Sequence, residues 1–393
     1  QVTSNTSDFR GGGVDLRDIS GADVRDNVFI GNRSREDGGA LNFDFCTGTV
    51  ANNLMSANSA RMGGGISHVG STITILSNTI SANVANSAGG VSFWASRSVF
   101  IDNKIISNTV SVMGGGVAGN SCEATFVNND ILSNTATNSG GLFLQICSVT
   151  FDGDVIAGNR ADDTTGGLWL SLANSTMHNT TIVDNRASGE GAGLFVGGSY
   201  VHLFHTTLAR NGSPAPSAEG TGIHVSNYAE MGESPMHSVL YLTNTIIVSH
   251  SVGITAAEAT ELHLEGTLWG NDLDWGGAGT ITTGTVNLWA NPGFVDPDGG
   301  DYHLAPGSPA VDAGVASGVF ADRDGDPRPA GPAFDLGADE RQGASLLLNK
   351  IAFPRVLDPG ETVTYSLVVT SAGVSPTTNV VLTDTLPALQ RSL

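Results

Sequence analysis

The chain has few positive charges, few cysteines and no long apolar segment, and each shortage excludes a class of protein. It carries 17 Lys and Arg against 38 Asp and Glu, a formal net charge of −21. This balance disfavours binding through phosphate groups, so we expect neither nucleic acid nor anionic lipid as a partner. No apolar run reaches the ~18 residues of a membrane-spanning helix. We therefore expect no membrane span in this chain.

The feature that the sequence does have is an asparagine that returns every 25 or 26 residues. The series is Asn32, Asn58, Asn83, Asn108, Asn134, Asn159, Asn185 and Asn211. A fixed period of this length predicts a stacked array whose units bury their apolar faces only against one another. We expect these side chains to form an internal structural ladder that satisfies backbone groups of neighbouring coils, and not a binding site.

Each repeat predicts three short strands. An apolar run lies between the periodic Asn and a polar residue five positions before it, as in NTISAN. A glycine cluster and an alternating run such as VSFWAS follow, and another short apolar run comes before the next turn. This pattern predicts an all-β fold, a right-handed parallel β-helix of about ten coils. A leucine-rich repeat and a calcium-binding nonapeptide roll fit less well, because the LxxLxL frame and the GGxGxD motif are missing.

Cysteine usage is sparse but in phase with the repeat. Cys46, Cys122 and Cys147 each lie seven residues before the first polar turn position of their coil. Cys122 and Cys147 should be neighbours on adjacent coils, near enough for a disulfide, and a row of free packed thiols is the alternative. A metal site is not expected, since no CxxC or Cys/His spacing is present.

The pattern changes twice along the chain. We expect the β-helix over residues 1–290, a C-terminal cap rich in Asp, Gly and Pro over 291–342, and an incomplete Ig-like β domain, a partial sandwich, over 343–393. The cap should cover the open end of the solenoid. Gln1 is expected to be the start of a mature or trimmed chain.

The cap contains, in order, NPGF, DYHL, SPAVDAG, DRDGDPRP and DLGADE. This series resembles the choice-of-anchor Q region of bacterial and archaeal surface proteins, and the preceding repeats are similar to those of polymorphic outer-membrane-protein-type β-helices. The last segment, with DPGE and TDTLP, resembles an Ig-like domain that occurs in tandem in prokaryotic surface proteins. The resemblance implies a secreted or cell-surface protein and no known reaction. The Ig-like part is either truncated or completed by a strand from a second copy, which would give self-association.

An aromatic stripe follows the glycine clusters. Phe143, Trp169 and Phe195 should point outward from three consecutive coils, His224 continues the series, and Trp94 lies two positions further along its own strand. Rings ~4.8 Å apart would form a flat platform for sugar rings or for a protein partner. The alternative is an external ladder covered by the turn loops.

Aspartates of the cap suggest calcium as the one cofactor. They are Asp296, Asp298, Asp301, Asp322, Asp324 and Asp326. The last three alternate as in a calcium loop, but glycine stands at the fourth position, and Ala333 stands where an EF-hand has its bidentate Glu. Turn formation is the competing role.

Two functions remain open. Glycoside hydrolysis needs two carboxylates facing one sugar, and Asp44, Asp162, Asp163 and Asp184 are candidates by residue type only. A lyase needs a base, and the few Lys and Arg are not clustered in the sequence. We therefore expect a non-catalytic structural or adhesin-like protein, such as a fibre or sheath subunit. Its partners would be polysaccharides, cell-envelope proteins or copies of itself; a polysaccharide lyase or glycoside hydrolase is the alternative.

Overall fold

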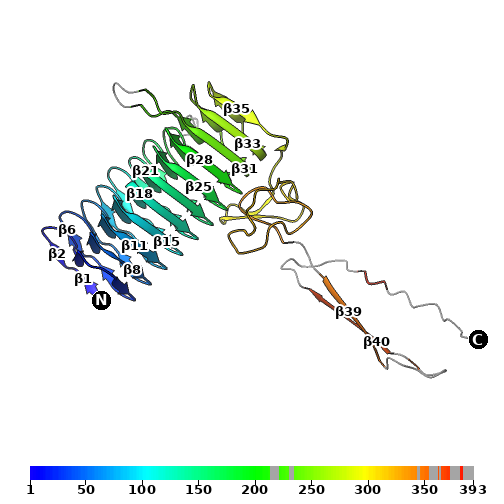
Figure 1. Cartoon of the computed structure of the whole chain (residues 1–393), viewed down its shortest axis with the longest axis horizontal. Helices are drawn as coiled ribbons and strands as arrows, with labels where there is room; N and C mark the ends of the chain where they lie inside the picture. Colours follow the sequence, from blue (N-terminus) through cyan, green and yellow to red (C-terminus); the bar gives the residue numbers. More distant parts are fainter. Residues whose placement is uncertain are drawn as a thin grey trace, which may run out of the picture. The chain divides into compact units, whose positions relative to one another are not determined.

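The computed structural model describes residues 1–212, 221–229, 234–342, 346–353, 362, 364–371 and 381–383. Residues 1–340 form one compact unit and residues 341–393 a second. The first unit is a right-handed parallel β-helix of about ten coils (Figure 1), which confirms the predicted fold class. Among the described residues, no helix has the length and apolarity needed to cross a membrane.

Each coil places one strand segment on each of three faces. The first face, which follows the glycine clusters, contains β3 (Val14–Arg17), β7 (Leu41–Asp44), β10 (Ile66–Val69), β14 (Val91–Trp94), the starts of β18 (Val117–Val127) and β21 (Leu142–Asp152), β24 (Leu168–Ser171), β27 (Leu194–Gly197), β30 (Thr221–Ser226), β32 (Val252–Ala256) and β34 (Leu273–Gly277). The second face contains β4 (Ala22–Arg25), β8 (Thr47–Ala51), β11 (Thr72–Leu76), β15 (Arg97–Ile101), the ends of β18 and β21, β25 (Asn174–His178), β28 (Tyr200–Phe204), the starts of β31 (Val239–Val248) and β33 (Glu261–Gly270), and β35 (Thr280–Thr283).

The third face carries the apolar run between the two polar turn positions. It contains β1 (Val2–Thr3), β5 (Val28–Ile30), β9 (Leu54–Ser56), β12 (Thr79–Ser81), β16 (Lys104–Ile106), β19 (Asp130–Leu132), β22 (Val155–Ala157), β26 (Thr181–Val183), β29 (Thr207–Ala209), the ends of β31 and β33, and β36 (Asn287–Trp289). Two small sheets lie at the turn after the third face, formed by β2 (Thr6–Ser7) with β6 (Arg33–Ser34), and by β13 (Val84–Ala85), β17 (Thr109–Val110), β20 (Thr135–Ala136) and β23 (Arg160–Ala161).

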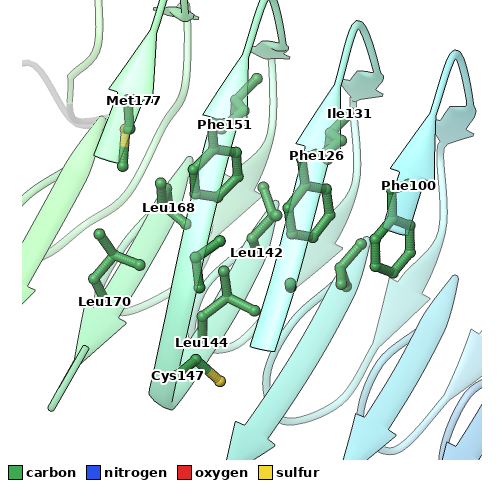
Figure 2. Packing of buried hydrophobic residues seen from close by; sticks show 14 of the residues in the cluster. Phe100, Phe126, Ile131, Leu142, Leu144, Cys147, Phe151, Leu168, Leu170 and Met177 are labelled. Carbon is green, nitrogen blue, oxygen red and sulfur yellow. The ribbon is translucent and has the colours of Figure 1, made fainter. Parts of the chain in front are cut away.

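The coils stack in register, so one residue type recurs at one place. Inside the solenoid, Phe100, Phe126 and Phe151 stack with ring centroids 4.4 Å and 4.9 Å apart (Figure 2). Period-2 alternation of the second-face strands sends these rings inward and their neighbours outward. The glycine clusters mark a close approach between coils, because a Cβ on Gly90 would lie 2.5 Å from the carbonyl oxygen of Gly116.

Residues 291–340, here called the flank segment, pack along the third face. From the sequence we expected them over the open end of the solenoid, and that prediction is wrong. Their Tyr302, Leu304 and Leu336 form one buried cluster with Val183 and Ile246 of the coils. The reason lies in the outward row of the third face. That row starts with Thr3, Ile30, Ser56 and Ser81 and is continuously apolar from Ile106 through Leu132 to Ala157, which leaves an apolar surface that the flank segment covers.

The flank segment contains one antiparallel pair, β37 (Phe294–Asp296) with β38 (Asp301–Leu304). A buried ion pair fixes its last part, where the guanidinium of Arg328 lies 2.9 Å from the Glu340 carboxylate, with both side chains almost fully buried. In the second unit, β39 (Leu346–Phe353) pairs antiparallel with β40 (Thr364–Ser371). The DPGE motif lies outside the described residues, and the Ig-like sandwich stays a prediction.

Candidate functional site

The periodic asparagines form a continuous chain of hydrogen bonds through the solenoid. From Asn32 to Asn211, each side-chain amide donates to the Oδ1 of the next asparagine at 3.0 Å. The same Oδ1 accepts the backbone N–H of the preceding asparagine, and the remaining amide hydrogen donates to a carbonyl one coil back, as from Asn134 to Ile105 at 2.9 Å. These polar groups are buried and satisfied internally, so they are not available to a ligand.

His250 continues this ladder where the repeat becomes irregular. Its Nε2 lies 3.2 Å from the amide nitrogen of Asn211, and its Nδ1 lies 2.9 Å from Oδ1 of Asn271. Because an amide nitrogen only donates, Nε2 must accept, and Nδ1 carries the proton. Burial lowers the pKa of His250 to about 4, so the ring is neutral near pH 7.

A second ladder runs five positions earlier and ends on an acid. Asn53, Asn78, Asn103 and Asn129 bond to one another in the same manner, and Asn129 donates to Asp154 from both its backbone and its side-chain nitrogen at 2.8 Å. Asp154 is fully buried, and burial raises the pKa of its carboxyl to about 7. Asp154 therefore interrupts the row of neutral amides with a buried carboxyl whose pKa is raised.

The cysteine positions also stack. Cys122 and Cys147 form a disulfide between adjacent coils, with Cα atoms 4.5 Å apart. Cys46 is a free, buried thiol, and its backbone N–H donates to the hydroxyl of Ser71. Thiols and hydroxyls therefore share one structural position of the coil, and only the adjacent cysteine pair can be bonded.

The predicted aromatic residues do stack, but with their ring faces against one another. Trp169 lies opposite Phe143 and Phe195, and the ring centroids are 5.9 Å and 4.0 Å apart, with His224 5.5 Å beyond Phe195. Rings lying side by side in one plane cannot bring their centroids within ~6 Å, because edge atoms would approach closer than ~3.5 Å. The rings therefore cover each other's faces, and the stack is not the flat platform that we expected.

Turn loops cover part of this stack. Glu190, on the loop before β27, pairs with His224 at 3.0 Å, and the indole Nε1 of Trp169 is buried with no hydrogen-bond partner in the described part of the chain. Trp94 stands apart in a different outward row, where it lies opposite Asn120, and it is 53% exposed. Of the five predicted residues, Trp94 is thus the one that is open to solvent.

Sequence reasoning missed a second ring stack on the second face. His202, Tyr241 and His263 lie on successive coils with centroids 4.5 Å and 4.6 Å apart and nearly parallel planes. The alternating runs YVHLF, VLYLT and ELHLE carried the signal. These runs could not be aligned because the repeat loses its spacing between them.

A cavity of about 340 Å³ lies between the flank segment and the third face. Leu132, Val155 and Val183 form its apolar floor, and Asp130, Asp184, Arg323, Asp324 and Asp339 are among its polar lining residues. Arg323 pairs with Asp130 at 2.8 Å, and Asp184 receives a hydrogen bond from Tyr302 at 2.5 Å and an ion pair from Arg210 at 3.0 Å. Most of these polar groups bind the flank segment to the coils.

The predicted calcium ligands do not converge on one point. Asp322 accepts the backbone N–H groups of Asp324 and Asp326 at 2.9 Å, and Asp296 accepts that of Gly299, as in Asx turns. Asp298 pairs with Arg210 at 2.7 Å. These contacts give three of the six aspartates a structural partner.

His303 forms the centre of the remaining acidic group. Its Nδ1 lies 2.5 Å from Asp301 and its Nε2 2.8 Å from Asp324. Burial alone would lower the pKa of His303, but the two hydrogen bonds outweigh it and raise the pKa to about 9. His303, Asp324 and Asp339 could hold a metal ion by distance, since their ligand atoms lie within 4.8 Å of one another. A metal ion would first have to displace the proton of the imidazolium.

The four carboxylates proposed for hydrolysis lie on separate parts of the fold. Asp44 is on the first face of an early coil, in ion pairs with Arg10 and Arg17. Asp162 and Asp163 follow β23 at the turn, and Asp184 follows β26 beside the flank segment. Only Asp184 lines the cavity described above.

One comparison with known proteins agrees with the fold. The family model described as right handed beta helix region matches residues 64–232. The crystal structure of pectate lyase Pel9A aligns with a TM-score of 0.37 and 14% identity, over 70% of this chain and 88% of the other. A likeness of this size says nothing about activity. The comparison with curated proteins finds no match.

Proposed function

We propose that this protein is a non-catalytic structural or adhesin-like protein of the cell exterior, in which the solenoid acts as a rigid rod. The observation that carries the proposal is the unbroken ladder from Asn32 through Asn211 and His250 to Asn271. A ladder of buried, mutually satisfied amides opposes bending and fraying of the coils. The repeated side chains therefore serve cohesion between coils.

Three features support a location outside the cell. The Cys122–Cys147 disulfide is typical of oxidising compartments. The net charge of −21 suits an exposed, hydrated surface. The resemblance of the flank segment to choice-of-anchor Q regions, and of the second unit to Ig-like repeats, implies a bacterial or archaeal surface protein. Polysaccharides, envelope proteins and further copies of the chain are the partners such a protein would meet.

Polysaccharide cleavage is the second candidate, and the cavity beside Asp184 is the observation that favours it. Burial raises the pKa of Asp339 in the same cavity, as suits a proton donor, and Asp184 lies there in an ion pair with Arg210. Against this role, Asp184 is bound by both Arg210 and Tyr302, and Asp339 accepts the backbone N–H of Leu304 at 2.7 Å. These contacts favour a structural role for both residues, in which they hold the flank segment in place on the coils.

The test is to incubate the full chain with neutral and acidic polysaccharides and to follow both reducing ends and unsaturated products. The proposal predicts product formation no faster than in buffer, for the wild type and for Asp184→Asn. Asp162→Asn, in an exposed loop, is the matched control. Turnover that Asp184→Asn abolishes and Asp162→Asn retains would establish the enzyme instead.

A further inference from the structure

A groove with a volume of about 460 Å³ is lined by residues of the first coils, among them Arg33 and Ser34 of β6. Figure 1 shows β6 near the N-terminal end of the solenoid. Its polar lining comes from Arg33, Arg35, Ser59, Arg61 and Asn86. None of the described residues that line it is acidic, although acidic residues outnumber basic ones by 38 to 17 in the chain. Stacking of the coils therefore brings Arg61 into one groove with Arg33 and Arg35.

Strand alternation aims two of the arginines to the same side. Arg33 and Arg35 are exposed, and Ser34 between them is buried and donates its hydroxyl to the Phe9 carbonyl at 2.6 Å. The backbone N–H groups of Arg33 and Arg35 donate to the Asn5 and Ser7 carbonyls at 2.8 Å and 3.0 Å. The guanidinium groups therefore extend from a backbone that the neighbouring coil fixes.

The next coil gives this groove its depth. Arg33 lies opposite Ser59 in the adjacent coil, and Ser59 lies opposite Val84. Ser59 is much shorter than Arg33, so the space beside the Arg33 side chain stays open. Arg61 follows two residues later and also lines the groove.

The arginines are only partly neutralised. Arg61 pairs with Glu36 at 3.0 Å and with Asp37 at 2.8 Å. Arg35 lies 3.9 Å from Asp8, and both side chains are largely exposed, so this pair contributes little. Arg33 has no carboxylate partner in the described part of the chain, and the side chains of Ser59 and Asn86 have no hydrogen-bond partner there either. Charged and neutral donors thus face one open space.

We propose that this groove binds the carboxylate or sulfate groups of an anionic glycan. A guanidinium group forms paired, charge-assisted hydrogen bonds with carboxylates and tetrahedral oxyanions, and the Ser59 and Asn86 side chains can bond to neighbouring sugar hydroxyls. The inference rests on the proposed function for the presence of glycans around the protein. At 0.1 M salt, charges more than ~10 Å away are largely screened, so most of the acidic remainder of the surface does not oppose binding at the groove.

The experiment measures binding of the full chain to dextran sulfate, to polygalacturonate and to uncharged dextran by isothermal titration calorimetry at 0.1 M salt. We expect at least one polyanion to bind, and dextran not to bind. The double variant Arg33→Gln/Arg35→Gln should bind the polyanion roughly tenfold more weakly, because two charge-assisted contacts are lost. Arg97→Gln is the matched control, since Arg97 lies on the second face and pairs with Glu123, and it should bind as the wild type does.

The outcomes separate the ligand sources and the two proposals. Binding of dextran sulfate alone identifies sulfate as the ligand group, and binding of polygalacturonate alone identifies carboxylate. The inference is overturned if neither polyanion binds, or if the double variant, with an unchanged melting temperature, binds as tightly as Arg97→Gln. Cleavage of polygalacturonate would overturn the non-catalytic proposal and leave the groove in place. Absence of both binding and cleavage would overturn the proposal of glycan binding in the groove and leave the non-catalytic proposal standing.

Discussion

Replacing Asp154 by asparagine should stabilise the protein in a pH-dependent way. Asp154 occupies the position at which the preceding coils have Asn53, Asn78, Asn103 and Asn129, and its side chain is 0% exposed. Burial raises the pKa of its carboxyl from 3.8 to about 7, although the hydrogen bonds from Asn129 act in the opposite direction. The folded state therefore takes up a proton more readily than the unfolded state does.

The sign follows from this difference. A raised folded-state pKa gives stability that is complete below pH 3.8 and is lost as the pH rises through about 7. Each pKa unit corresponds to about 1.4 kcal/mol, so relative to low pH this carboxyl costs about 2 kcal/mol at pH 5, where folding must keep it protonated, and about 4 kcal/mol at pH 8, where it is charged. Asparagine has the same shape, carries no charge and restores an amide to the ladder. Asp154→Asn should remove this cost.

Urea unfolding at the two pH values measures the effect. We expect Asp154→Asn to raise the free energy of unfolding by about 4 kcal/mol at pH 8 and by about 2 kcal/mol at pH 5. Asp162→Asn, at an exposed site, should change it little at either pH. A gain that does not depend on pH, or a loss at pH 8, would refute the reasoning.

Three further substitutions test the packing. Phe126→Ala should cost about 3–5 kcal/mol in urea unfolding, because it removes the central ring of the internal stack, and a loss below 1 kcal/mol would contradict the packing. Cys122→Ser should cost about 3 kcal/mol, and dithiothreitol should then have no further effect, whereas continued sensitivity to the reductant would exclude this disulfide. Arg328→Met removes the guanidinium that pairs with the buried Glu340 carboxylate, so hydrogen exchange should rise across residues 291–340 with a local loss of about 3–5 kcal/mol. Uniform exchange over the coils instead would show that the ion pair does not hold the flank segment.

The sequence could predict the coil and its asparagines because they obey one constraint in every repeat. The buried turn at Asn83, Asn108 and Asn134 presents the same backbone groups each time, so one side chain solves the same problem in every coil. The glycine clusters follow similarly from close backbone approach, as at Gly90. The periodicity of the sequence was therefore sufficient to predict the fold.

Other features depend on information that a period does not contain. The orientation of the Trp169 and Phe195 rings is set by side-chain torsions, so spacing alone could not distinguish a flat platform from a face-to-face stack. The only sequence signal for the position of the flank segment is the change from Ser81 to Ile106 along the outward row of the third face. Arg35 and Arg61 lie 26 residues apart, and they line one groove only once the coil register is known.

The most direct test of the rigid rod is native-state hydrogen exchange at single-residue resolution. The backbone N–H of Asn83, Asn108 and Asn134 each donates to the Oδ1 of the next ladder residue at 2.9 Å. If the ladder locks the coils together, these turn amides should exchange as slowly as those of the buried strand β15, through global unfolding only. Exchange at the rate of open surface turns would contradict the account.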